Sequence, residues 1–159
     1  MSEFNEISCI AETRKHQLRV AELLLKCAQN LISRAMQHDK SKLESLEFDV
    51  FVKYTPRLKG MSYSTDPDSE YQKCLREMRP ALAWHYQSND HHPEHFGDVG
   101  ISGMNLMQLL EMICDWKAAT ERHSDGDIMR SIDQNKVRFK IDPQLEAILI
   151  KTAEKITGL

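Results

Sequence analysis

Apolar side chains recur every three or four residues over positions 20–35 of this 159-residue chain, at Val20, Leu24, Cys27, Leu31 and Ala35. This spacing places them on one face of an α-helix, which we expect to run from about Glu12 to Ala35. His16 lies one turn before the first of them, so its imidazole is predicted to point inward. A break near Gln29 and Asn30 would divide the segment into two helices.

Helical spacing continues through the rest of the chain, and no segment alternates for long like a half-buried strand. With only six glycines and five prolines, long helices are favoured over a turn-rich β fold, and the predicted class is all-α. Residues 55–69 are predicted to form the one clear loop, and Pro80 is predicted to kink or divide its helix. Helices are expected over residues 48–54, from Asp68 or Ser69 to His85, and over about 105–122, 127–138 and 142–156.

Length, charge, apolar runs and cysteine spacing limit the kinds of protein that this chain could be. The chain is expected to form one domain over residues 1–159. Its formal net charge of −3 lacks the basic excess of a nonspecific nucleic-acid binder, so a nucleic-acid polymer is not an expected partner. No apolar run approaches the roughly 20 residues of a membrane helix. The four cysteines have neither zinc-binding nor disulfide spacing, which favours reduced thiols in a cytoplasmic protein.

A histidine and an aspartate are adjacent at positions 38 and 39, and Lys42 follows one helical turn after His38. Imidazole and carboxylate ligands suit Mn, Fe, Co, Ni or Zn, but two neighbouring residues cannot complete a metal shell. Facing helices commonly supply such ligands in a helical bundle, so one or two divalent ions are expected between helices. Further candidate ligands are spread along the chain, at His16, His85, His91, His92 and Asp115.

Each candidate also has a plainer interpretation. A single inward histidine, such as His16 or His85, more often donates a hydrogen bond to a backbone carbonyl within a core. Asp115 alone would be a surface carboxylate, and His91 and His92 would belong to an exposed polar turn. Several candidates in this order favour a metal site, with at least one of His91 and His92 as a ligand.

Three runs of sequence, 16–23, 38–42 and 112–119, are similar to motifs of the HD-domain family of metal-dependent phosphohydrolases. They resemble its first-histidine helix, its HD-x-x-K element and the helix of its final aspartate. The resemblance covers about residues 12–122 and implies an HD-like helical bundle, with helices over 127–157 packed on it. It also implies a set of core metal ligands, which are His16, His38, Asp39 and Asp115.

The run His91-His92-Pro93-Glu94 resembles the HH-E element of the HD-GYP branch, which holds more than one metal. His85 then corresponds to the intermediate histidine of that branch. The Gly-Tyr-Pro tripeptide of the branch is absent here, which argues against a cyclic dinucleotide substrate. The chain as a whole is most similar to an uncharacterised family of small HD-like proteins of phages and bacteria.

The resemblance implies a hydrolase in which a metal-bound hydroxide attacks a nucleotide or a related phosphate ester. Asp39 and Lys42 would act in catalysis, and Lys42, Lys117 and Arg122 would contact the phosphate. Two other functions remain open: a catalytically silent module that binds a nucleotide or a protein, and a di-iron oxygenase of the HD fold. The substrate itself, the metal and the formation of a homodimer also remain open.

Overall fold

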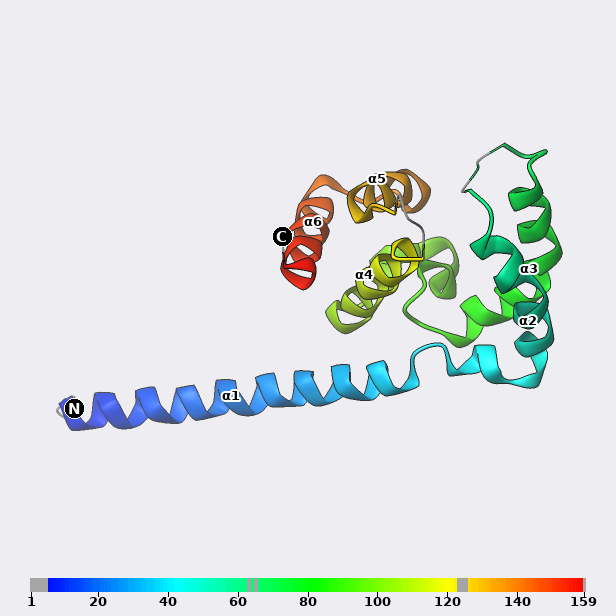
Figure 1. Ribbon diagram of the computed structural model, residues 1–159. Coiled ribbons are helices and arrows are strands. Elements are labelled where there is room, and N and C mark those ends of the chain that lie inside the picture. Colours follow the sequence, from blue (N-terminus) through cyan, green and yellow to red (C-terminus); the bar gives the residue numbers. More distant parts are fainter. Residues whose placement is uncertain (1–5, 63, 65, 123–125, 159) are drawn as a thin grey trace. The chain divides into compact units, whose positions relative to one another are not determined.

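Every regular element in the computed structural model is a helix, within the residues that it describes, 6–62, 64, 66–122 and 126–158 (Figure 1). This confirms the predicted all-α class. The chain divides into two compact units, Met1–Gln37 and His38–Leu159, which are described separately. The single domain over residues 1–159 stays a prediction. None of the helices in the described ranges combines the length and the hydropathy of a membrane span.

The first unit contains one helix, α1 (Glu6–Gln37), which runs for 32 residues. It is unbroken at Gln29 and Asn30, so the predicted division was wrong, and it extends beyond both predicted ends. No described side chain of α1 is buried within this unit taken by itself. The inward orientation of His16 stays a prediction.

The second unit contains five α-helices and two 3₁₀ helices in its described residues: η1 (Lys40–Leu43), α2 (Ser45–Lys59), α3 (Glu70–Ser88), η2 (Pro93–Gly103), α4 (Leu106–Thr120), α5 (Ile128–Phe139) and α6 (Pro143–Thr157). The five α-helices of this unit occur in the order of the predicted helices. The predicted loop was too long, because α2 continues through Pro56 to Lys59. The helix α3 also continues through Pro80, so Pro80 does not divide it, and the alternative of a kink stays a prediction.

Packing explains why the two prolines do not end their helices. A proline inside a helix costs about 3 kcal/mol through a lost hydrogen bond and a steric clash. The helices α2 and α3 offset this cost by packing on each other around Tyr54, Cys74 and Met78, all of which are buried. Sequence periodicity does not reveal such a partner in advance.

Polar side chains begin most of the α-helices, as predicted. Ser69 accepts a hydrogen bond from Gln72 N at the start of α3, and Asp142 accepts from Gln144 N and Leu145 N before α6. Asp127 likewise caps α5. The predicted turn at Ser124–Asp127 lies partly outside the described residues. These caps satisfy backbone N–H groups that have no partner inside the helix.

A second and larger apolar core joins α4, α5 and α6 and also contains Ile101 of η2. Other buried members of this larger core include Met112, Ile113, Ile132, Leu149 and Ala153.

Ile132 is fully buried in α5, so the substitution Ile132→Ala should lower the free energy of unfolding by about 2–5 kcal/mol. Urea unfolding measures the change. The control is Val137→Ala in the same helix, where the side chain is 79% exposed and the expected change is within about 0.5 kcal/mol. Equal losses for the two variants would contradict this description of the core.

Candidate metal centre

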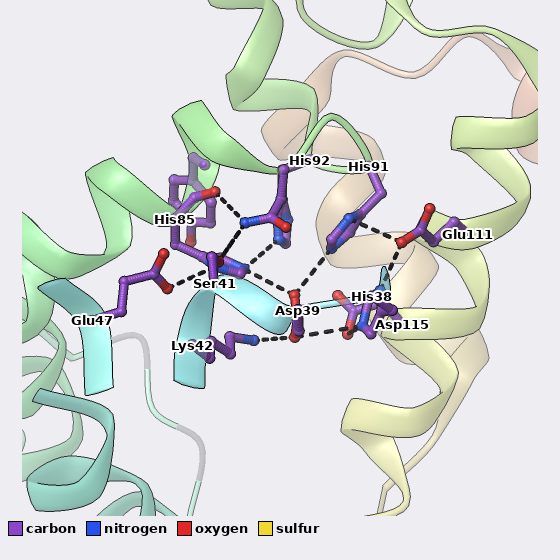
Figure 2. Close-up of polar contacts among 12 residues, drawn as sticks. His38, Asp39, Ser41, Lys42, Glu47, His85, His91, His92, Glu111 and Asp115 are labelled. Carbon is purple, nitrogen blue, oxygen red and sulfur yellow. Dashed lines mark hydrogen bonds and ion pairs between the residues drawn. The ribbon is translucent and has the colours of Figure 1, made fainter. Parts of the chain in front are cut away.

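Histidine and acidic side chains from four segments converge in the second unit (Figure 2). The segments are the residues just before η1, the end of α3, the turn before η2 and the middle of α4. All the candidate ligands predicted within this unit take part, and they are His38, Asp39, His85, His91, His92 and Asp115. They form overlapping groups whose ligand atoms lie within 4.8 Å of one another, so the cluster could hold a metal ion.

The first set, here called the three-histidine group, consists of Asp39, His85, His91 and His92. Asp39 Oδ1 lies 3.1 Å from His85 Nε2 and 3.5 Å from His91 Nε2. His92 Nε2 lies 3.0 Å from His85 Nε2. The Nε2 atoms of His85 and His91 therefore face one carboxylate oxygen, and His92 Nε2 lies beside that of His85.

The second set, here called the His38 group, consists of His38, Asp39 and Asp115. His38 Nε2 lies 3.4 Å from Asp39 Oδ2 and 3.6 Å from Asp115 Oδ1. Asp39 thus belongs to both groups, and its two oxygens face different histidines. A carboxylate placed in this way has the geometry to bridge two cations.

The spacing of these atoms is compatible with metal coordination. Nitrogen and oxygen ligands lie about 2.0–2.2 Å from a metal such as zinc, which puts neighbouring ligands of one ion roughly 3.0–3.5 Å apart. The distances within the two groups are close to this range. Asp39 Oδ1 and His91 Nε2 are also buried without a hydrogen bond. Buried polar atoms seldom lack a partner, and a cation between these two would supply one.

Local structure explains how the ligands are held. Asp39 has φ 55° and ψ 19°, a left-handed conformation that aspartate tolerates better than most residues. Asp90, next to His91, accepts a hydrogen bond from Gln108 Nε2 at 2.6 Å. The carbonyl of the same Gln108 side chain completes the capping box of α4 by accepting from Asn105 N. The cap of α4 therefore also fixes the histidine-rich turn against that helix.

Two glutamates that sequence reasoning did not assign to the site lie directly against its histidines (Figure 2). Glu111 Oε1 lies 2.8 Å from His38 Nδ1 and 3.2 Å from His91 Nδ1. Glu47 Oε2 lies 2.9 Å from His85 Nδ1. The signal for Glu111 was its position one turn before Asp115 on the same helix. Glu47 gave only a weak signal, as an acid at the start of the apolar run of α2.

His38, His91 and Glu111 form a third possible ligand group, through the two Nδ1 atoms. A neutral imidazole has one lone pair for a metal, so the same rings cannot use both nitrogens at once. Binding through Nε2 engages all six converging side chains, whereas binding through Nδ1 engages three. The Nε2 arrangement therefore satisfies more of the buried polar atoms.

The comparisons with known proteins place the chain in a family. A family model described as a family of unknown function, DUF5662, matches residues 5–155. The chain belongs to this family. No curated protein and no solved structure matches the chain. Membership in DUF5662 thus covers nearly the whole chain, including the metal centre, and leaves the chemistry to be inferred from the residues.

Burial and nearby charges raise the pKa of one histidine of this DUF5662 chain and lower the pKa of two others. The contact with Asp115 raises the pKa of His38 to about 9, although burial opposes the shift. Burial lowers the pKa of His91 and, helped by the neighbouring imidazoles, lowers the pKa of His92 to about 3. At neutral pH the lone pairs of His91 and His92 are therefore available to a metal, whereas His38 must first lose a proton.

The two aspartates are anionic at neutral pH. Burial alone would raise the pKa of Asp39, but its contacts with His85 and Lys42 outweigh burial and lower that pKa well below its usual range. Burial likewise opposes the effect of His38 on Asp115, and the net pKa shift is downward. Both carboxylates can therefore bind a cation without losing a proton.

The remaining predicted residues lie in different surroundings. Lys42 Nζ pairs with Asp39 Oδ2, as expected for a cation beside the site. Lys117 pairs with Glu121 at 2.9 Å, and Arg122 is exposed after the end of α4. His16 belongs to α1, in the other unit, and its role as a ligand stays a prediction.

Binding of Mn²⁺ at this centre should stabilise the folded chain. A free cation concentration 100 times the dissociation constant adds about 2.7 kcal/mol to the free energy of unfolding. Thermal unfolding with Mn²⁺ and after treatment with a chelator measures the effect. Asp39→Ala should abolish the shift, whereas His95→Ala should keep it, because the exposed His95 side chain contacts the Tyr86 carbonyl and the Phe96 ring and belongs to none of the ligand groups. Identical melting of the wild-type protein under both conditions would count against a metal centre.

Proposed function

We propose that this chain is a metal-dependent phosphohydrolase that acts on a nucleotide or a related phosphate ester. The observation that carries the proposal is the position of Asp39, whose two carboxylate oxygens face two different sets of imidazole nitrogens. Pairs of cations about 3.5–4 Å apart are common in phosphatases and nucleases, where they bind both the attacking and the leaving oxygen. The HD-like order of the sequence motifs supports the same reaction class.

The donor set suits hard or borderline divalent cations such as Mn, Fe, Co, Ni or Zn. When bound, such cations would lower the pKa of a water toward about 7 and polarise the phosphoryl oxygens. Asp39 and Asp115 reduce the net charge of the loaded centre. His85, His91 and His92 would supply imidazole ligands from a largely buried position, which excludes bulk water from one side.

Lys42 is the cation best placed to act on a phosphate ester. Its ammonium group contacts Asp39 Oδ2 and lies 5.3 Å from the centre of the Phe51 ring, which favours a cation over its face. A phosphate oxygen at the centre would lie beside this ammonium group, which would offset negative charge on the leaving oxygen as its bond to phosphorus breaks. Lys117 and Arg122 lack comparable contacts with the ligand groups, so their role is proposed on the sequence alone.

An iron oxygenase is the second candidate, because the same histidine and carboxylate ligands also suit a pair of iron ions. Iron-loaded protein that consumes oxygen but releases no phosphate would favour this reaction. Protein that binds a nucleotide without any metal would instead favour a binding module.

The proposal predicts that protein supplied with Mn²⁺, Co²⁺ or Fe²⁺ releases phosphate or nucleoside from some member of a nucleotide panel. His38→Ala and Asp39→Ala should abolish that release, because each removes a ligand atom from the His38 group. His95→Ala is the matched control and should retain activity. Circular dichroism checks that each variant is folded. Full activity in both ligand variants would refute the proposal.

A further inference from the structure

The histidines of the centre share a feature that catalysis as proposed above does not explain. His38, His85 and His91 each turn Nδ1 toward a glutamate, at distances between 2.8 and 3.2 Å. We infer that Glu47 and Glu111 are positioning residues that hold the Nε2 atoms of these histidines toward two cations. This inference rests on the metal centre of the proposed function and adds the residues that organise it.

Proton chemistry fixes the direction of these contacts. A glutamate in its carboxylate form can only accept a hydrogen bond, so in that form an Nδ1–H that faces it would donate. A neutral imidazole carries only one N–H, and its Nε2 atom therefore keeps the lone pair that binds a metal. Asn89 Nδ2 lies 3.1 Å from His85 Nδ1 but does not compete for this role. It donates instead to Ser41 Oγ and to the His85 carbonyl, both at 2.8 Å.

The burial of Glu47 also supports a positioning role. Its side chain is 0% exposed, and Oε1 makes no hydrogen bond in the described structure. A buried carboxylate with an unsatisfied oxygen lowers the stability of a fold. Packing of α2 alone does not account for an acid at this position, whereas the orientation of His85 does.

The two glutamates differ in the number of ligand groups that they contact. Glu111 contacts His38 of the His38 group and His91 of the three-histidine group through one oxygen. Glu47 contacts only His85, which belongs to the three-histidine group. Loss of Glu111 should therefore weaken both cation positions, and loss of Glu47 should weaken one.

Titration of the metal-free full-length chain with Mn²⁺ tests this difference, with calorimetry or the spin-resonance signal of free Mn²⁺ as the readout. Glu111→Leu should weaken both binding steps by about 10–100-fold, and Glu47→Leu should weaken one step by a similar factor. His38→Ala and His85→Ala identify which step belongs to which group. The control is Glu146→Leu, which removes a carboxylate that pairs with Lys136 in the other core region.

Urea unfolding of the metal-free protein distinguishes a positioning role of Glu47 from a merely structural one. We expect Glu47→Leu to unfold at the same or a higher urea concentration than the wild type, because an apolar side chain replaces a buried carboxylate. Loss of stability with unchanged Mn²⁺ affinity would overturn the inference. Should a leucine variant fail to fold, Glu47→Gln and Glu111→Gln decide. They keep an acceptor oxygen without its charge, so they should weaken the same steps by less, and unchanged affinity in them overturns the inference.

The outcomes separate this inference from the proposed function, because the readout is metal affinity and not activity. Wild-type chain that binds two Mn²⁺ ions but hydrolyses no phosphate ester, with both glutamate variants weakened, supports the inference and refutes the function. Active wild-type chain with unaffected glutamate variants refutes the inference alone. A wild-type chain that binds no metal refutes both.

Discussion

The carboxylate of Asp39 joins all the parts of this centre. Its backbone adopts a left-handed conformation between α1 and η1, which is unfavourable for most residues other than glycine. From this turn, Oδ1 faces the imidazoles of His85 and His91, and Oδ2 faces His38 and the ammonium group of Lys42. Without this anion His85 would share no carboxylate with His38, although His38 and His91 would still share Glu111. The candidate function depends on it for the same reason.

Charge balance explains why such a cluster is stable only with positive charge at its centre. Four carboxylates, from Asp39, Glu47, Glu111 and Asp115, lie among the imidazoles, and the ammonium group of Lys42 pairs with that of Asp39. Burying negative charge in this way is costly. In the cation-free chain, the raised pKa of His38 supplies one compensating proton at neutral pH. A divalent cation would replace that proton and would also satisfy Asp39 Oδ1 and His91 Nε2, which are buried without a hydrogen bond.

Much of this arrangement is visible in the sequence, because helical spacing and capping residues are local signals. They predicted the all-α class and the starts of α3, α5 and α6. Long-range effects were missed. The packing of α2 on α3 stabilises both helices despite Pro56 and Pro80, although a proline in the sequence predicts a helix break. The sequence did identify the histidines and aspartates that converge in the second unit, because the chain has only seven histidines and because Asp39 and Asp115 lie in motifs that resemble those of the HD family.

The supporting residues of the centre could not be predicted in the same way. Glu47 and Glu111 are ordinary helix carboxylates in sequence, and only the fold brings each against a histidine. The sequence also could not choose between His91 and His92, whereas in the folded chain both belong to the three-histidine group. The role of His16 stays a prediction, because α1 forms a separate unit.

A crystal structure with Mn²⁺, located by its anomalous scattering, tests the central claim most directly. We predict two peaks on either side of Asp39, one within about 2.0–2.3 Å of the Nε2 atoms of His85, His91 and His92 and the other at a similar distance from His38 Nε2. No peak there, with the same side chains joined only by hydrogen bonds, would contradict it.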